Sequence, residues 1–183
     1  MRLAGRWLSD FLRLALGIGL ALAAMQLPAL TAAYDLALVQ SAGELRRDID
    51  ARKEVARGFY GLSDTSDPDV IGALRTREPS NAQGLENSVA REDLLRSAHA
   101  RLAGSSALLR PIIALADATD DPIGNKRALL RTTLERHEPQ VLLGTAAATY
   151  GLAGLLMGLL LANLLLALLG GLRTPRQEAL RGR

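Results

Sequence analysis

The stretch Val141–Leu172 reads VLLGTAAATYGLAGLLMGLLLANLLLALLGGL and contains no charged residue. A transmembrane helix needs about 20 mostly apolar residues to cross the roughly 30 Å of hydrocarbon in a bilayer. As a helix this stretch would extend over about 48 Å at 1.5 Å per residue, which is longer than one span requires. We therefore expect a transmembrane helix within residues 141–172, with its first turns outside the bilayer and packed on soluble helices.

A second uncharged stretch, residues 14–34, reads LALGIGLALAAMQLPALTAAY and has the length of one span. Trp7 and Tyr34 flank it, and amphipathic rings favour headgroup interfaces. Pro28 is expected to bend this helix near its outer end, because proline removes one backbone hydrogen bond. A cleaved signal peptide is the alternative, since the start is basic and small residues follow the apolar run. Cleavage would leave a single C-terminal anchor.

Residues 35–140 form the sizeable polar region, and helical periodicity runs through most of it. The pattern predicts a helix over 36–62, a short helix over 69–77 capped by Asp67, and helices over about 85–103 and 126–137. The apolar run 107–116 is expected to be buried, with Pro111 starting or bending a helix. The residues predicted to face inward are Leu38, Leu45, Ile49, Ala56, Phe59, Leu85, Val89, Leu95, Ala98, Leu102, Leu129, Leu130 and Leu134, and the predicted ion pairs are Arg46–Asp50, Asp48–Arg52 and Asp50–Lys53.

The two ends of the chain carry the positive charge. The arm 1–13 has three arginines and one acid, and the tail 173–183 has four arginines and one acid, whereas 35–140 has 15 basic and 17 acidic residues. Short Arg-rich flanks stay on the cytoplasmic side of a membrane. We therefore expect an all-α integral membrane protein with a cytoplasmic arm (1–13), a first span (14–34), a helical periplasmic domain (35–140), a second span (141–172) and a cytoplasmic tail (173–183).

Small residues recur at helical spacing in both predicted spans. Small residues allow membrane helices to approach closely, and the pair Gly154–Gly158 has the GxxxG spacing that favours this. We expect an interface between these faces, either between the two spans of one chain or between copies of the protein. The predicted helix-packing residues are Ala15, Gly19 and Ala23 in the first span and Ala147, Gly151, Gly154, Gly158 and Ala162 in the second.

No set of residues in the sequence has the spacing of a known catalytic, cofactor or metal site. His99 and His137 have no second ligand at a metal-binding spacing, and the chain has no cysteine. Asp117, Asp120 and Asp121 lack the regular oxygen ligands of an EF-hand, so a helix-capping turn is the preferred interpretation. The spans hold no charged residue, which argues against transport. Basic residues elsewhere alternate with acids, which argues against nucleic-acid binding.

Several features together resemble a known family. They are the short basic start, Gln26-Leu27-Pro28 followed by Tyr34, the charged helix with Arg57-Gly58-Phe59-Tyr60, and the closing span with its arginine tail. In this layout the chain resembles a bacterial family catalogued as domain of unknown function 2937. The resemblance implies a bacterial inner-membrane protein with two spans, whose outer side is the periplasm.

The expected role is non-catalytic, as an interaction, scaffold or envelope-maintenance component without a cofactor. Its expected partners are the lipid bilayer and either a membrane protein or another copy of the chain. One alternative is a periplasmic ligand-sensing module, which would need a membrane partner because the eleven-residue tail is too short for an output domain. The other alternative is an envelope enzyme, which would need a pocket holding His99 or the aspartates.

Overall fold

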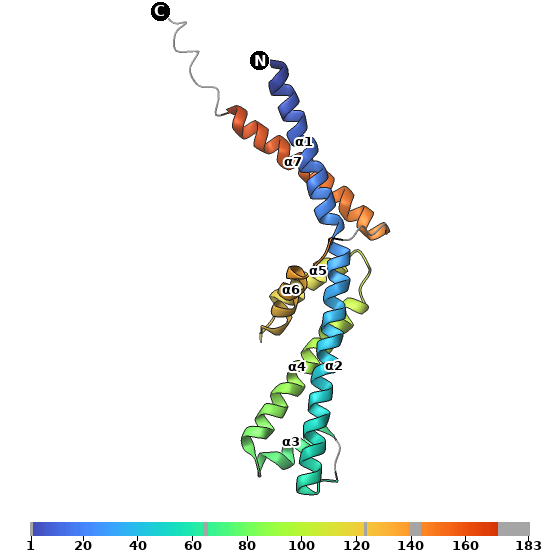
Figure 1. Cartoon of the computed structure of the whole chain (residues 1–183), viewed down its shortest axis with the longest axis vertical. Coiled ribbons are helices and arrows are strands. Elements are labelled where there is room, and N and C mark those ends of the chain that lie inside the picture. The colour runs from blue at the N-terminus through green and yellow to red at the C-terminus, as the bar shows by residue number, and fades with distance from the viewer. Residues whose placement is uncertain (1, 64–65, 123, 140–143, 172–183) are drawn as a thin grey trace, which may run out of the picture. The chain divides into compact units, whose positions relative to one another are not determined.

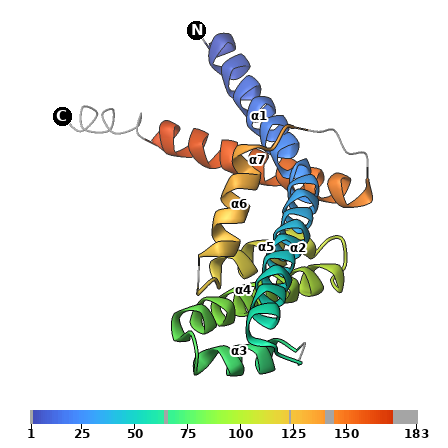
Figure 2. The same ribbon diagram turned by 60° about the horizontal axis from the view of Figure 1, so that its bottom comes forward.

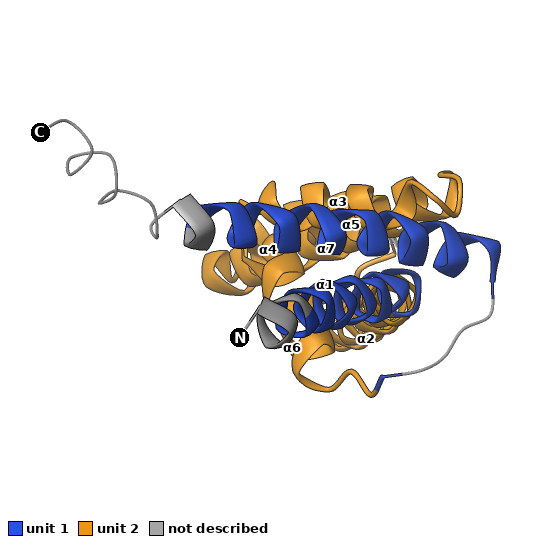
Figure 3. Ribbon diagram, turned by 90° about the horizontal axis from the view of Figure 1, so that it is seen from above, with its two compact units in different colours: residues 1–29, 139–183 blue, residues 30–138 orange. Residues whose placement is uncertain are grey.

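The computed structural model describes residues 2–63, 66–122, 124–139 and 144–171, and every regular element within them is a helix (Figure 1). The prediction of an all-α chain is confirmed over these residues. The chain forms two compact units, unit 1 with residues 1–29 and 139–183 and unit 2 with residues 30–138 (Figure 3). The predicted arginine tail, residues 173–183, lies outside the described residues.

Unit 1 contains α1 (Arg2–Met25) and α7 (Thr145–Gly171). Two described helical stretches are long and apolar enough to cross a membrane, Trp7–Tyr60 and Thr145–Leu168. Pro139 and the described residues 144–171 belong to unit 1. Residues 141–143, with which the second apolar stretch begins, lie outside the described residues.

Pro28 marks the break between α1 and α2 (Leu27–Tyr60), as its position predicts. Proline has no backbone N–H, and its ring meets the carbonyl group four residues earlier, so a helix cannot continue regularly through it. Gln26 therefore forms a turn, and Pro28 occupies the first turn of α2, where its missing N–H costs nothing. Helical structure thus continues with no intervening loop from the first apolar stretch into the polar region.

The polar face of α2 carries two of the three predicted ion pairs. Arg46 Nη2 lies 2.5 Å from Asp50 Oδ1, and Arg52 Nη2 lies 2.9 Å from Asp48 Oδ2. Lys53 pairs with Asp67 instead of Asp50. In the pairs Arg46–Asp50 and Asp48–Arg52 the two residues are four positions apart, the spacing at which opposite charges stabilise a helix surface.

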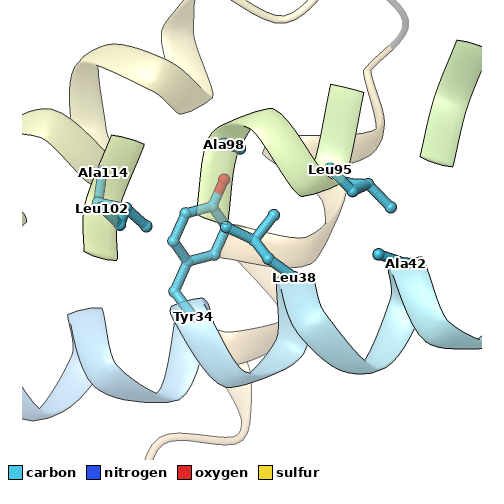
Figure 4. Packing of buried hydrophobic residues seen from close by; sticks show 7 residues of the cluster. All are labelled: Tyr34, Leu38, Ala42, Leu95, Ala98, Leu102 and Ala114. Carbon is cyan, nitrogen blue, oxygen red and sulfur yellow. The ribbon is translucent and has the colours of Figure 1, made fainter. Parts of the chain in front are cut away.

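The remaining helices of unit 2 are α3 (Asp67–Arg75), α4 (Pro79–Ala103), α5 (Arg110–Thr119) and α6 (Asn125–Glu135). Two hydrophobic clusters hold them against α2. One cluster joins the first turns of α2 to α4 and α5, through Tyr34, Leu38, Ala42, Leu95, Ala98, Leu102 and Ala114 (Figure 4). The other joins the last turns of α2 to α3 and the start of α4 (Figure 2), through Ile49, Ala56, Val70, Ile71, Leu74, Ala82 and Leu85.

The helix starts differ from the predicted ones in two places. Ser66 caps α3, because its side chain accepts a hydrogen bond from the backbone N–H of Asp69 at 3.3 Å. Asp67, the predicted cap, lies in the first turn and points to α2 instead. The helix predicted to begin at about residue 85 begins earlier, because Pro79 occupies the first turn of α4, where its fixed φ suits a helix.

Three predictions of burial are wrong. Phe59 is 79% exposed and Leu134 is 53% exposed, although helical spacing placed both among the core residues. In the apolar run 107–116, Ile112 and Leu115 are exposed, and the buried residues of α5 are the smaller Ala114, Asp117 and Ala118. Helix α5 therefore turns mostly small side chains and Ile113 inward, and exposes Ile112 and Leu115.

Candidate functional site

The predicted glycine face of α7 forms the contact with α1 in unit 1. Ala147, Gly151, Gly154, Gly158 and Ala162 are all buried. A Cβ atom added at Gly154 would lie 2.7 Å from Ala24 Cβ and against the carbonyl oxygen of Leu20. One added at Gly158 would lie 2.7 Å from the Cα atom of Gly17. The two backbones therefore approach so closely that only glycine fits at these positions.

Within one chain the predicted face of α1 is mostly exposed, although Ala23 borders a groove that residues of α7 also line. Ala15, Gly19 and Ala23 are exposed, and a Cβ added at Gly19 would have no other atom within 4 Å. The surface of α1 that meets α7 carries Leu16, Gly17, Leu20, Ala24 and Met25 instead. Whether the Ala15–Gly19–Ala23 face packs between copies stays a prediction.

The order of the contacts shows that α1 and α7 run antiparallel. Met25 lies beside Gly151, whereas Leu16 lies beside Gly158. Farther along, Arg13 Nε donates a hydrogen bond of 2.9 Å to Asn163 Oδ1. Asn163 is one of the two amide residues of the apolar stretches, and its side chain joins the helices as expected for a polar group in a span.

The far end of α2 in unit 2 exposes an apolar and aromatic surface. Val55 is 73% exposed and Phe59, one turn later, is 79% exposed. Their side chains border a groove of about 390 Å³ that Tyr60, Glu78 and other residues of α2 and α4 line. We call this surface the α2 tip. Exposed aromatic and branched apolar side chains beside a groove are typical of protein-binding surfaces.

Polar contacts fix the aromatic residues of the α2 tip in place. The Tyr60 hydroxyl donates a hydrogen bond to Glu78, and the Arg77 guanidinium lies 5.4 Å from the centre of the Tyr60 ring. The Phe59 ring meets the Tyr60 ring edge-on with centroids 4.9 Å apart. The hydrogen bond from Tyr60 lowers the pKa of Glu78, which also accepts from Asn81 at 2.9 Å. These contacts hold the Tyr60 ring in one position, and the exposed Phe59 ring packs against it.

An ion cluster behind the α2 tip joins α3 to α2. Asp67 accepts hydrogen bonds from Arg46 at 2.6 and 3.0 Å and from Lys53, whose side chain is buried. The hydrogen bonds from Arg46 and then Lys53 outweigh desolvation and lower the pKa of Asp67 to about 2. The cluster therefore remains charged at neutral pH and holds α3 in its position.

A second groove of about 430 Å³ lies between α2, α4 and α6 of unit 2. Leu45, Leu95 and Leu129 supply its apolar lining, and Glu44 stands at its polar edge. The Asn125 Oδ1 atom accepts a 3.0 Å hydrogen bond from Arg91, which assigns the Nδ2 atom as the donor. This Nδ2 atom is buried and has no acceptor among the described residues. We call this site the α6 groove.

The acidic residues before α6 serve the fold. Asp117 is buried and pairs with Lys126 at 3.1 Å and with Arg101, and Lys126 is also buried and donates 2.8 Å to the Asp120 carbonyl oxygen. Asp121 accepts 2.9 Å from the backbone N–H of Arg127 in the first turn of α6. Asp121 thus makes the capping contact that the sequence predicts, and Asp117 is the centre of a buried ion pair that joins α5 to α6.

The structure brings His99 of α4 against Asp35 of α2, with 2.8 Å between Nδ1 and Oδ1. No spacing rule reveals this pair, because 64 positions separate the two residues. A histidine oriented by a carboxylate can transfer protons, but neither groove described above includes either residue. Among the described residues, no three His, Cys, Asp or Glu side chains gather closely enough to hold a metal ion.

Comparison with known proteins identifies a family. No curated protein and no solved structure matches the chain. The family described as "Protein of unknown function (DUF2937)" matches residues 8–174, which include both apolar stretches and all of unit 2. This match confirms the resemblance drawn from the basic start, the Gln26-Leu27-Pro28 segment and the Arg57–Tyr60 motif. The chain therefore belongs to the DUF2937 family.

Proposed function

We propose that this protein is a non-catalytic interaction component of a bacterial inner membrane, which presents unit 2 to a protein partner in the periplasm. In this proposal α1 and α7 span the bilayer and both ends of the chain lie in the cytoplasm. Two apolar helical stretches, an antiparallel α1–α7 pair and net positive charge in both terminal arms support it. Because α1 and α7 are antiparallel, the N-terminal end of α1 and the C-terminal end of α7 lie on the same side of the bilayer in this proposal. This agrees with the positive charge of both terminal arms.

The close α1–α7 contact also favours a retained first span over a cleaved signal peptide. Gly154 and Gly158 pack directly against the backbone of α1. Removal of α1 would leave this glycine face without its partner, and glycine in a helix costs stability unless close packing offsets it. We therefore include α1 in the mature protein.

The observation that carries the proposed role is the exposure of Phe59 and Val55 at the α2 tip. Large apolar side chains that stand out from an ordered surface gain free energy when a partner covers them. Only 3% of the chain is aromatic, yet Phe59 and Tyr60 lie together here. Nothing in the described part of unit 2 covers Phe59. We infer that a protein partner does.

A photoactivatable amino acid at position 59 tests this role in intact membranes. We expect irradiation to join it to one recurrent protein, because Phe59 is the most exposed aromatic side chain of unit 2. The same amino acid in place of Arg131, which is exposed on α6, is the matched control and should give no such product. A product that requires the residue at position 59 and is lost in Val55→Ser supports the proposal. Equal products at both positions, or none at position 59, would contradict it.

The α6 groove favours a second function, the sensing of a small ligand. Its apolar lining and the buried Asn125 Nδ2 donor suit a molecule with an apolar body and one hydrogen-bond acceptor. Buried donors without acceptors are rare in native proteins, so this atom calls for a partner. In this alternative the sensor acts through a membrane partner.

A further inference from the structure

The orientation of α5 is the reverse of that expected in a water-soluble domain. Its inner surface carries the buried Ala114, Asp117 and Ala118 together with the partly buried Ile113, whereas Ile112 and Leu115, with Leu109 directly before the helix, face outward. Ile112 and Leu115 are 60% and 62% exposed, and Leu109 is 51% exposed. A helix in water buries its largest apolar side chains. The outer surface of α5 therefore requires an apolar environment.

Helix α5 packs at the end of unit 2 where α2 leaves the predicted first span. Ala114 belongs to the cluster of Tyr34, Leu38 and Leu102 (Figure 4). In that view Ala114 and Leu102 lie at the Tyr34 end of the row, away from Ala42. Tyr34 closes the second apolar stretch of the sequence. Helix α5 thus lies at the level where the chain passes from the span into the polar domain.

The outward face of α2 indicates how far the apolar environment extends. Ala32, Leu36 and Val39 follow one another at helical spacing and are all exposed, on the side of α2 opposite the buried Leu38. The next exposed residues with long side chains, Gln40 and Glu44, are polar, so the apolar stripe ends at Val39. An exposed apolar stripe that continues past Tyr34 indicates contact with lipid up to about Val39, which includes the level of α5.

We propose that α5 is an interfacial helix, whose surface formed by Leu109, Ile112 and Leu115 lies in the outer headgroup region of the bilayer. The occupant is lipid because the surface lies at the level of the lipid-facing stripe of α2. Arg110 is exposed at the start of α5 and suits the anionic phosphates of that region. This inference rests on the proposed membrane topology. It adds a third contact with the bilayer, from a helix too short to span it.

Spin labels on single cysteines test the proposal, because the chain contains no cysteine of its own. Full-length Ile112→Cys and Leu115→Cys are labelled and placed in phosphatidylethanolamine–phosphatidylglycerol vesicles at about one protein per vesicle. Collisions with lipid-soluble oxygen and a water-soluble nickel chelate are then compared. Val55→Cys is the matched control, because Val55 is exposed and apolar but lies at the α2 tip. Leu160→Cys reports the span itself.

We expect the labels at 112 and 115 to collide several-fold more with oxygen than with the nickel chelate, and the label at 55 to show the opposite preference. Water-like behaviour at 112 and 115, with a lipid signal at 160, would overturn the α5 proposal and leave the spans intact. Restricted access to both reagents at 112 and 115 would mean that protein covers α5, which also overturns it. A water-like label at position 160 would refute the spans on which the proposal depends.

Discussion

Replacement of Gly154 by leucine is expected to separate α1 from α7 and to lower the thermal stability of the full-length protein by several degrees. The added Cβ would lie against the carbonyl oxygen of Leu20 and 2.7 Å from Ala24 Cβ, and the rest of the side chain has no room. Backbone atoms cannot move aside as a flexible side chain can. Overpacking of this kind costs about 1–3 kcal/mol. In a membrane the hydrophobic effect does not offset this cost, because the added leucine side chain is in an equally apolar environment when it faces lipid.

Gly19→Leu is the matched control for this experiment. It makes the same chemical change on the same helix pair, at a position where an added Cβ meets no other atom within 4 Å. Size-exclusion chromatography of heated detergent samples measures the temperature at which each variant loses its native peak. We expect wild-type behaviour for Gly19→Leu and a lower temperature for Gly154→Leu. If Gly154→Leu kept the wild-type temperature, the described α1–α7 contact would be wrong.

Replacement of Asp117 by asparagine is expected to destabilise unit 2 by about 3–5 kcal/mol, the cost of removing one partner from a buried ion pair. Lys126 is 2% exposed, and its ammonium group would lose the carboxylate that compensates its burial. Arg101 is half exposed, so water can solvate its guanidinium group. Loss of its ion pair with Asp117 therefore costs less stability than loss of the Lys126 pair. The loss of stability therefore comes mainly from the unpaired charge of Lys126, and we expect it to weaken the packing of α5 against α6.

Hydrogen–deuterium exchange of the full-length protein in lipid nanodiscs measures this effect by segment. We expect peptides of α5 and α6 to exchange about a hundredfold faster or more in Asp117→Asn, as such a loss of stability implies. Peptides of α1 and α7 should not change. Asp120→Asn is the matched control, because only the backbone carbonyl of Asp120 takes part. The double variant Asp117→Leu, Lys126→Met should recover much of the protection, since apolar residues can replace a buried pair. Faster exchange in Asp120→Asn than in Asp117→Asn would contradict the conclusion that the Asp117 carboxylate is the centre of this ion pair.

The sequence predicts the features of this fold that depend on local spacing. The two apolar stretches, the break before Pro28 and the ion pairs Arg46–Asp50 and Asp48–Arg52 all arise within a few residues of one another. The glycine face of α7 is also local, because Gly151, Gly154 and Gly158 share one side of a helix.

The features that sequence reasoning missed depend on contacts between distant segments. Helix α1 has small residues on two faces, and only the structure shows that the face with Gly17 and Ala24 meets α7. The pairs His99–Asp35 and Asp67–Lys53 join different helices, so no spacing rule reveals them. Helix α5 was predicted to be buried because its residues are apolar. That inference assumes water outside, whereas a membrane surface would reverse which face the large side chains occupy.

The candidate site was only partly visible in the sequence. The Arg57–Tyr60 motif was noted as part of the family resemblance, but helical periodicity placed Phe59 in the core. In the structure the core side of α2 continues from Ala56 to the partly buried Tyr60, and Phe59 is exposed on another side of the helix. A single exposed aromatic residue near a helix end cannot be told from a core residue by spacing alone.

Thiol accessibility in spheroplasts is the measurement that tests the central claim most directly, namely two spans with unit 2 outside. Single cysteines replace Glu54 in unit 2 and Asp10 in the basic arm, both of which are exposed. A membrane-impermeant maleimide should label Glu54→Cys in intact spheroplasts, and Asp10→Cys only after the membrane is permeabilised. Labelling of Asp10→Cys in intact spheroplasts, or protection of Glu54→Cys until permeabilisation, would contradict the account.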